Sequence, residues 1–288
     1  MSKSVLILGA SGKIGRHSAQ AFEAAGWSVK RYDRQKGDMT KAAENCDVIV
    51  NGLNPPNYHD WKTIIPQITS EVIHAARCSG ATVLLPGNVY HFGDQSGVWS
   101  EATPAKPVSR KGKIRLTMEQ DYALSGVQTI VLRAGNFIDP ERQGCVMSQI
   151  YLRDIRRGRI TLPGPAETQQ AMCYLPDWSR AAVALAEKRD TLSQFEDVPF
   201  AGHTLNALDI KSGIEGILNR EIRFARFPWW VFTVTAPFWE LAREMKEMRY
   251  LWNTDHALSD VRLTQILKGF EVTSLDKVLR STLPTRSV

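Results

Sequence analysis

Apolar runs alternate with amphipathic segments along the first half of the chain. The run Val5-Leu6-Ile7-Leu8 predicts a buried strand, and residues 16–25 after it have the spacing of an amphipathic helix. Further strands are predicted at residues 29–33, 46–51, 82–85 and 129–132, and further helices at residues 61–78 and 111–123. Strands that alternate with helices pair in parallel through right-handed crossovers, and β-branched runs suit a sheet covered on both faces. The pattern therefore predicts an α/β fold with a Rossmann-type, doubly wound and mostly parallel sheet.

The regular alternation of predicted strands and helices ends after residue 135. Prolines punctuate this part, with a predicted helix at residues 177–187 and short strands at 198–201 and 222–227. We therefore expect the sheet domain in residues 1–135, with its sheet and helices completed by parts of residues 171–190. Residues 136–288 are expected to form mostly a smaller, substrate-binding domain over the carboxyl ends of the strands.

The first predicted strand leads into a glycine-rich segment, Gly9-Ala10-Ser11-Gly12-Lys13-Ile14-Gly15. Gly9 allows a tight turn, Gly12 lets the backbone approach a pyrophosphate, and Gly15 lets the helix pack close to the strand. The free N–H groups at the start of the helix then face the phosphates. We therefore expect a dinucleotide to bind at Gly9, Ser11, Gly12, Lys13, Ile14 and Gly15.

The residues near the predicted second strand bear on the choice between NAD and NADP. Asp33 ends that strand, and a carboxylate there accepts hydrogen bonds from the adenosine ribose hydroxyls, which favours NAD. Arg34 beside it and Arg16 after the glycine loop favour a 2′-phosphate and so NADP. The sequence slightly favours NADP, because the attraction of two guanidinium groups for a 2′-phosphate outweighs the preference of one carboxylate for a ribose hydroxyl. The alternative for Arg16 is an ion pair with nearby acids.

The loop after the third predicted strand begins Asn51-Gly52-Leu53-Asn54, and its strand should end beside the nicotinamide ribose. Gly52 permits a close backbone approach, so Asn51, Gly52 and Leu53 are candidate cofactor-binding residues. Asn54 and Tyr58 are candidates for the wall of the substrate cleft. His59 nearby is interpreted as an ordinary loop histidine rather than a catalyst.

Composition narrows the class of protein. The 288 residues are 43% hydrophobic and 23% charged, which is typical of a globular chain with a sizeable core. The net charge of +6 is spread along the chain, apart from a short cluster of arginines at 153, 156, 157 and 159. Nucleic-acid binding would need a longer basic stripe with interleaved aromatics, so a small anionic ligand is the better interpretation. Cys46, Cys78, Cys145 and Cys173 lack metal-ligand or redox spacing, so we expect no metal.

Localisation and assembly are predicted only coarsely. The first strand begins almost at once, with no signal peptide before it, and reduced cysteines favour the cytoplasm. The most apolar segment, residues 228–239, holds three of the eight tryptophans but is too short to span a bilayer. It suits a buried helix or a homodimer contact better than a membrane surface.

Several motifs together resemble the extended short-chain dehydrogenase/reductase family, which includes NAD-dependent nucleotide-sugar epimerases and dehydratases. The matching segments are Gly9-x-x-Gly12-x-x-Gly15, Gly37-Asp38, Val89-Tyr90-His91-Phe92-Gly93, Leu132-Arg133-Ala134-Gly135-Asn136-Phe137 and Leu175-Pro176-Asp177-Trp178-Ser179-Arg180-Ala181. The chain also looks like a subgroup that bears Pro-Gly-Asn-Val-Tyr and Lys-Gly-x-Ile-Arg. The resemblance implies an NAD(P)-binding Rossmann fold, with Asp38 near the adenine and His91 and Asn136 near the substrate.

The sequence departs from this family at its catalytic signature, a Ser or Thr followed by Tyr-x-x-x-Lys. Pro86 falls where the Ser or Thr should be, and Asn88 lies two residues on. Lys111 stands at the tyrosine position and Arg115 at the lysine position, and no tyrosine lies between Tyr90 and Tyr122. The spacing places Lys111 and Arg115 one helical turn apart on one face.

Three interpretations of this departure stay open. Lys111 replaces the tyrosine as proton donor beside Arg115; or Asn88 and Tyr90 bind the substrate, with Tyr90 as the acid; or the chain binds its cofactor without catalysis. Lys111 and Arg115 also suit a solvated ion-pair ladder along the helix. We expect either a nicotinamide-dependent oxidoreductase or epimerase acting on a small polar or sugar-like substrate, or an inactive redox sensor. The sensor would contact a partner through residues 228–252.

Overall fold

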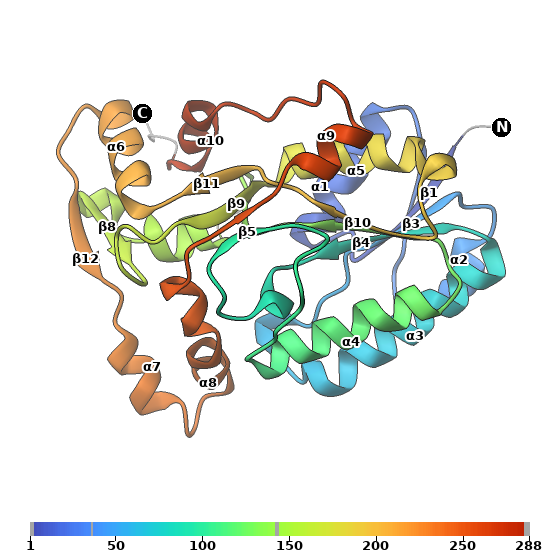
Figure 1. Ribbon diagram of the computed structural model, residues 1–288, viewed down its shortest axis with the longest axis horizontal. Helices are drawn as coiled ribbons and strands as arrows, with labels where there is room; N and C mark the ends of the chain where they lie inside the picture. Colours follow the sequence, from blue (N-terminus) through green and yellow to red (C-terminus); the bar gives the residue numbers. More distant parts are fainter. Residues whose placement is uncertain (1–2, 36, 142–143, 285–288) are drawn as a thin grey trace.

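A parallel sheet of six strands, in the order β10-β6-β4-β3-β1-β2, forms the centre of the molecule (Figure 1). The computed structural model describes residues 3–35, 37–141 and 144–284. The strands of the sheet are β1 (Ser4–Leu8), β2 (Ser28–Arg31), β3 (Val48–Asn51), β4 (Thr82–Gly87), β6 (Thr129–Arg133) and β10 (Phe195–Pro199). Every neighbouring pair is parallel, so the predicted Rossmann-type sheet is confirmed.

Helices cover both faces of this sheet, as Figure 1 shows. One face carries α1 (Lys13–Ala24), α5 (Leu175–Glu187) and α9 (Val261–Ile266), and the other carries α2 (Met39–Ala43), α3 (Trp61–Ser79) and α4 (Arg110–Leu124). Successive residues of β1 alternate between the two cores: Val5 and Ile7 pack with α1 and α5, whereas Leu6 packs with α3 and α4. Because side chains of a strand alternate between faces, a strand covered on both faces must be apolar throughout, as β1 is.

The direction of the crossovers reverses at β1, which lies between β2 and β3. Loops that leave the carboxyl ends of β1 and β3 therefore diverge and leave a crevice, which is where open α/β sheets bind ligands. The helix predicted at residues 16–25 begins earlier, at Lys13, because Gly12 is already its N-cap. The second strand ends at Arg31 rather than at residue 33, because Asp33 turns the chain by accepting a hydrogen bond from the Gln35 N–H at 3.0 Å.

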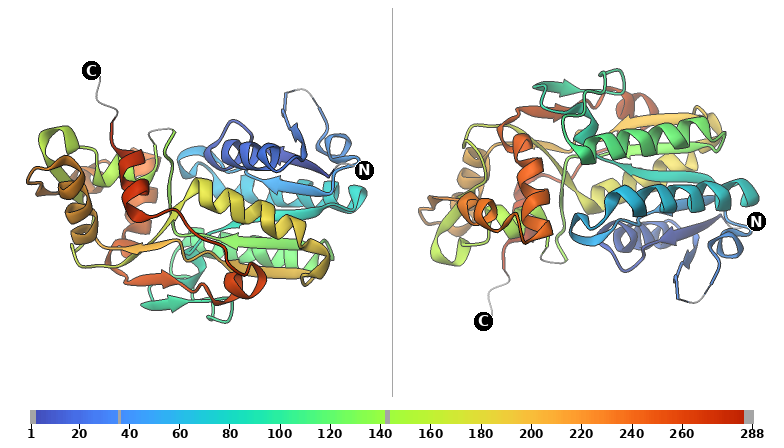
Figure 2. Two further views of the ribbon diagram at one scale, coloured as in Figure 1. Left: turned by 90° about the horizontal axis from the view of Figure 1, so that it is seen from above. Right: turned by 90° about the horizontal axis from the view of Figure 1, so that it is seen from below.

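The remaining elements gather mainly at one end of the sheet (Figure 2). They include a three-stranded sheet of β11 (His203–Leu205), β9 (Gln170–Tyr174) and β7 (Asn136–Ile138), and pairs of β12 (Arg223–Arg226) with β8 (Arg159–Leu162) and β13 (His256–Leu258) with β5 (Gly97–Trp99). The helices here are α6 (Ala207–Leu218), α7 (Trp229–Thr235), α8 (Glu240–Glu247) and α10 (Leu275–Thr282). Short helical turns are η1 (Pro56–Tyr58), η2 (Tyr90–Phe92), η3 (Met147–Tyr151), η4 (Ile155–Arg157), η5 (Arg189–Thr191) and η6 (Met248–Asn253).

The chain returns to the large sheet after residue 135, because β10 pairs with β6 and α9 packs beside it. The division of the chain into residues 1–135 and 136–288 therefore stays a prediction. Within the described ranges, no helix combines the length and apolar character needed to cross a bilayer.

Candidate cofactor and active site

The glycine loop joins β1 to α1 with backbone packed against backbone. Gly9 has φ of 70°, and a Cβ placed on it would lie 2.8 Å from the Gly52 carbonyl oxygen. A Cβ on Gly15 would lie 2.3 Å from the Gly9 carbonyl oxygen. Side chains at either position are therefore excluded, and the loop after β3 closes directly onto the loop after β1.

The start of α1 is suited to bind an anion. Its N-cap, Gly12, has no side chain to cap the helix, and the first turn holds no acidic residue. The Gly12 N–H donates to the Gly9 carbonyl at 2.9 Å, which leaves the next N–H groups directed out of the helix end. Ser11 and Gly12 are exposed, Ile14 packs against the core, and the Lys13 ammonium donates to the Gly144 carbonyl oxygen. The cradle fits the pyrophosphate of a dinucleotide.

Asp33, Arg34 and Asp38 all lie exposed after β2. Asp38 caps α2 by accepting a hydrogen bond from the Thr40 N–H at 2.7 Å. Asp33 also accepts a hydrogen bond from a nearby backbone N–H. Both carboxylates therefore stabilise the local backbone, whether or not they also contact an adenosine.

Arg16 is held away from this adenosine side by two acids from the segment after β7. Its guanidinium pairs with Asp139 at 2.9 Å and with Glu141 at 2.7 Å. Asp139 also accepts a hydrogen bond from the His17 ring at 2.9 Å. Burial opposes the charge on Arg16, yet the bonds to Asp139 and Glu141 raise the pKa of the guanidinium overall. A 2′-phosphate would have to compete with both carboxylates for Arg16.

The loop after β3 is anchored by Asn51, which is buried. Its amide donates to the Tyr122 hydroxyl at 3.1 Å, and its oxygen accepts from the Leu53 N–H at 3.2 Å. Asn54 then accepts a hydrogen bond from the Arg115 guanidinium at 2.7 Å. The candidate cofactor loop and the candidate catalytic helix are therefore joined at Asn54 and Arg115.

Lys111 lies near the start of α4, which Ser109 caps by accepting from the Gly112 N–H at 3.0 Å. The Lys111 side chain is only 2% exposed, although it carries an ammonium. That ammonium pairs with Glu244 and lies 2.7 Å from a carboxylate oxygen of Glu247, both on α8. Lys111 thus faces neither bulk solvent nor an ion-pair ladder along its own helix.

Two tyrosines lie beside Lys111. The Tyr58 hydroxyl is 3.3 Å from the Tyr90 hydroxyl, and the Lys111 ammonium lies 5.0 Å from the centre of the Tyr58 ring. The nearby Tyr90 hydroxyl, together with burial, raises the pKa of Tyr58 well above its usual value. Tyr58 is therefore a protonated hydroxyl, able to donate a hydrogen bond.

The backbone before α3 is strained at this place. Asn57, Tyr58 and Asp60 have φ of 54°, 61° and 40°, in a region that residues with a Cβ rarely adopt. Such strain is typical of sites where side-chain placement matters more than local stability. It directs Tyr58 towards Tyr90 and α4.

Arg115, one turn beyond Lys111, packs its guanidinium 4.7 Å from the centre of the Trp61 ring. Burial lowers the pKa of Arg115, and its Nε is a buried donor with no hydrogen-bond partner among the described residues. The chain thus keeps a desolvated guanidinium where the family it resembles has lysine.

Asn88 and His91 belong instead to a buried charge network around Arg133. The Arg133 guanidinium bonds to Glu119 at 2.8 Å, to Asp197 at 2.7 Å and to the Asn88 carbonyl at 2.6 Å. His91 Nδ1 lies 3.1 Å from this guanidinium. Burial and the positive charge of Arg133 lower the pKa of His91 to about 4.

The Asn88 side chain accepts from the Tyr90 N–H at 3.0 Å, so it shapes the turn that presents Tyr90. Asn136 is half-buried at the start of β7, where it pairs with Met172 of β9. The structure therefore brings together Lys111, Arg115, Tyr58, Tyr90 and Asn54, whereas His91 lies in the network around Arg133.

Sequence reasoning missed the acids that cover Lys111. Glu240, Glu244 and Glu247 lie on α8, where Glu240 pairs with His59 at 2.9 Å and Glu244 pairs with Arg110 at 3.0 Å. Their spacing of four and three residues places them on one helical face, which was the available signal. Their partners lie more than a hundred positions earlier, and nothing local identifies them.

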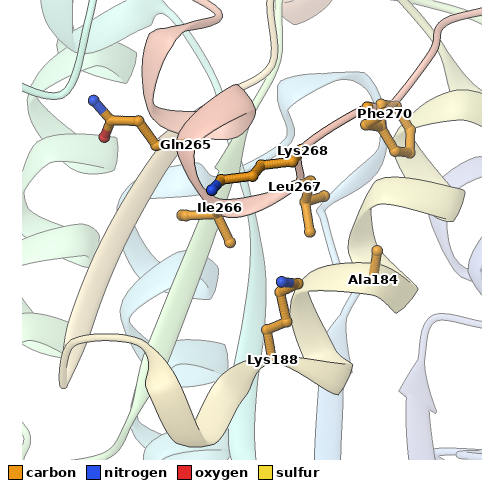
Figure 3. A pocket seen from close by; sticks show the side chains of 8 residues that line it. Ala184, Lys188, Gln265, Ile266, Leu267, Lys268 and Phe270 are labelled. Carbon is orange, nitrogen blue, oxygen red and sulfur yellow. The ribbon is translucent and has the colours of Figure 1, made fainter.

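A surface hollow of about 480 Å³ lies between α5 and the end of α9 (Figure 3). Lys188, Lys268 and Phe270 are among its lining residues. It lies near the amino ends of the strands, because the neighbouring Arg189 carbonyl accepts from Gln128, which directly precedes β6. It is therefore remote from the glycine loop and from Lys111.

Comparison with solved structures identifies the same fold. The chain is similar to MoeE5 in complex with UDP-glucose and NAD, with a TM-score of 0.76 at 14% identity over 98% of this chain and 97% of that one. It is similar to UDP-glucuronic acid 4-epimerase from Bacillus cereus in complex with UDP-glucuronic acid and NAD, with a TM-score of 0.73 at 16% identity over 97% of each chain. The NAD-dependent NDP-hexosamine 5,6-dehydratase TunA gives 0.73 at 15% identity over 98% and 96%. Neither a protein-family model nor a curated protein matches the sequence.

Proposed function

We propose that the chain binds NAD(H) between β1 and β3 and catalyses a redox reaction of the epimerase or dehydratase type on a small polar or sugar-like substrate. The carrying observation is the backbone packing of Gly9, Gly15 and Gly52 beside a helix start that has no capping side chain. This cradle suits a pyrophosphate. Support also comes from the fold shared with proteins solved in complex with NAD and UDP sugars.

NAD rather than NADP is the proposed cofactor, which revises the sequence-based balance. That balance counted Arg16 and Arg34 against Asp33, but Arg16 is engaged by Asp139 and Glu141. Arg34 is then the one remaining arginine that favours NADP, against Asp33, which favours NAD. The charge of Arg16 is balanced by the two carboxylates and adds little attraction for a 2′-phosphate. The structures of similar fold that were solved in complex with NAD favour the same choice.

The cofactor, when bound, accepts and returns a hydride. In our proposal Lys111 holds the proton that moves to or from a substrate oxygen, with Tyr58 and Tyr90 donating hydrogen bonds to that oxygen. Arg115 positions the site and cannot relay a proton, because a guanidinium does not titrate in this range.

Glu244 and Glu247 limit access to this donor. They occupy the hydrogen-bonding positions around the Lys111 ammonium, so a substrate oxygen reaches it only by replacing a carboxylate. We therefore include a displacement of α8 before the chemical step, of the kind that closing segments make in many enzymes.

The covered ammonium also favours a second candidate, a cofactor-binding protein without turnover. In that case the ion pairs of Lys111 with Glu244 and Glu247 are permanent, and bound NAD changes how the protein contacts a partner. The two candidates share cofactor binding, but only the first predicts turnover and only the second predicts a partner contact that depends on NAD.

Cofactor binding is tested by titration calorimetry with NAD, NADH and NADP. Micromolar affinity corresponds to about −8 kcal/mol, and we expect NAD to bind more tightly than NADP. Arg34→Ala should weaken NADP alone, with Arg31→Ala as a control at an exposed arginine that pairs with Glu23. If neither dinucleotide binds at millimolar concentration, the proposal is wrong.

Turnover is tested by following nicotinamide absorbance with carbonyl and alcohol substrates and by product analysis with UDP sugars. Lys111→Arg keeps the charge but removes a transferable proton, and should lower the rate by on the order of a hundredfold. Lys113→Arg, at an exposed position on the same helix, is the matched control. NAD binding without turnover of any of these substrates would favour the second candidate.

A further inference from the structure

The hairpin of α7 and α8, residues 229–247, exposes large apolar side chains. Trp230 is 72% exposed, Val234 67% and Phe238 95%. They follow one another at intervals of four residues, and Trp239 beside them is 45% exposed. Phe238 and Trp239 belong to the loop between α7 and α8, and the ribbon of this loop projects as the lowest part of the molecule in Figure 1.

Trp230 and Val234 lie on one face of α7, and the other face of this helix packs against the molecule. On the other face Trp229 is buried, and its indole N–H donates to the Pro163 carbonyl at 2.7 Å. Phe232 stacks on Phe227 with ring centres 5.2 Å apart, and on Trp239 at 5.8 Å. The inner face therefore anchors α7 to the molecule, and the outer apolar face is presented from a rigid support.

Bases outnumber acids among the exposed charged side chains of α8 and of η6 after it. Glu244 and Glu247 pair inward with Lys111, whereas Glu240, at the start of α8, has a partly exposed side chain that pairs with the exposed ring of His59. Three bases are exposed: Arg243 and Lys246 on α8, and Arg249 on η6, which follows it. The Arg249 guanidinium lies 5.1 Å from the Trp229 ring centre, and that of Arg153 lies 5.8 Å from the Phe227 ring centre, so positive charge borders the root of α7.

We propose that this hairpin docks the protein onto the surface of an anionic lipid bilayer. Tryptophan and phenylalanine side chains enter the boundary between headgroups and acyl chains, while neighbouring Lys and Arg attract anionic headgroups. The hairpin, together with η6 after it, carries both features. A symmetric contact between two copies would bring Arg243, Lys246 and Arg249 of each copy towards the same patch of the other, which charge repulsion disfavours.

The test is co-sedimentation of the full chain with vesicles of phosphatidylcholine, with and without phosphatidylglycerol. We expect binding to the anionic vesicles that weakens as salt is raised. Trp230→Ser with Phe238→Ser should reduce partitioning by about tenfold or more. Lys246→Gln and Arg249→Gln should each reduce it by about fivefold.

The control variant is Leu124→Ser, which removes an 85% exposed leucine at the end of α4 and should leave vesicle binding unchanged. Equal binding to neutral vesicles, or binding that survives Trp230→Ser with Phe238→Ser, would overturn the proposal. The proposal would also be overturned if the protein bound neither the anionic nor the neutral vesicles. A dimer seen by light scattering that Phe238→Ser dissociates, without vesicle binding, would assign the patch to a second copy instead.

Discussion

The two halves of the carboxyl edge of the sheet are built in different ways. At β1 and β3 the loops meet through backbone alone, with Gly9, Gly15 and Gly52 in contact. At β4 and β6 the edge is filled by charged and aromatic side chains, including the network around Arg133 and Tyr90, which pairs with Tyr58 from the loop after β3. The first half offers N–H groups to a ligand, whereas the second already satisfies most of its polar groups internally.

This difference explains why one half is easier to recognise than the other. A backbone cradle requires glycine at set intervals between a strand and a helix, so a short stretch of sequence is enough to identify it. A side-chain site depends on which distant segments supply the partners. Lys111 is interpreted quite differently once Glu244, 133 residues later, is known to cover it.

The largest expected effect breaks the side-chain half. Arg133→Leu leaves the buried carboxylate of Glu119 and the half-buried carboxylate of Asp197 without their partner, and should destabilise the protein by about 4 kcal/mol. Urea unfolding followed by circular dichroism measures it. Arg280→Leu, which removes an exposed partner of Asp276, is the control and should change the midpoint little. If both variants shifted the midpoint of urea unfolding by a similar small amount, the network around Arg133 would not stabilise the fold as we expect.

The next prediction breaks the backbone half. Gly15→Ala places a methyl group 2.3 Å from the Gly9 carbonyl oxygen, so the loop must open, at about 3 kcal/mol. NAD affinity should fall with it, which calorimetry checks. Gly216→Ala, where no atom lies within 4 Å of the new methyl, should instead leave both stability and affinity intact or raise stability slightly. Unchanged NAD affinity in Gly15→Ala would show that the close packing is unnecessary.

Acid should weaken the side-chain half in particular. His91 has its pKa lowered to about 4 by burial and by Arg133, so the folded state keeps it neutral where the unfolded chain protonates it. Stability is therefore full above the unfolded value and is lost as pH falls, by about 2 kcal/mol between pH 7 and pH 5. Denaturation series at several pH values measure this slope. His91→Asn should reduce it, leaving the smaller part due to His256, whose pKa burial also lowers.

The smallest expected effect concerns the two helix starts. Ser109 caps α4 through the Gly112 N–H, whereas Gly12 leaves α1 uncapped. Ser109→Ala should cost about 1 kcal/mol in unfolding free energy without changing NAD affinity. Ser96→Ala, at an exposed serine outside the helices, should have almost no effect. Loss of NAD affinity in Ser109→Ala would mean that the two halves are more closely coupled than their contacts indicate.

The sequence by itself determined the elements of the sheet and the glycine loop. Val5 to Leu8 is apolar on both faces, so it had to lie in a covered sheet, and Gly9 to Gly15 had to turn it into a helix. Strand and helix patterns arise from neighbours a few positions apart, and glycine requirements follow from local backbone geometry. These features are the ones that the structure confirms with only small shifts of boundaries.

Only the tertiary structure decided what surrounds the charged side chains. Arg16 pairs with Asp139, 123 residues away, and Arg133 pairs with Asp197, 64 residues away. Lys111 is buried beside Glu244 and Glu247 of α8, and Trp230 stays exposed on a helix that buries Trp229. A charged or aromatic side chain is compatible with either environment, because its free energy depends on partners that the fold brings from distant parts of the chain.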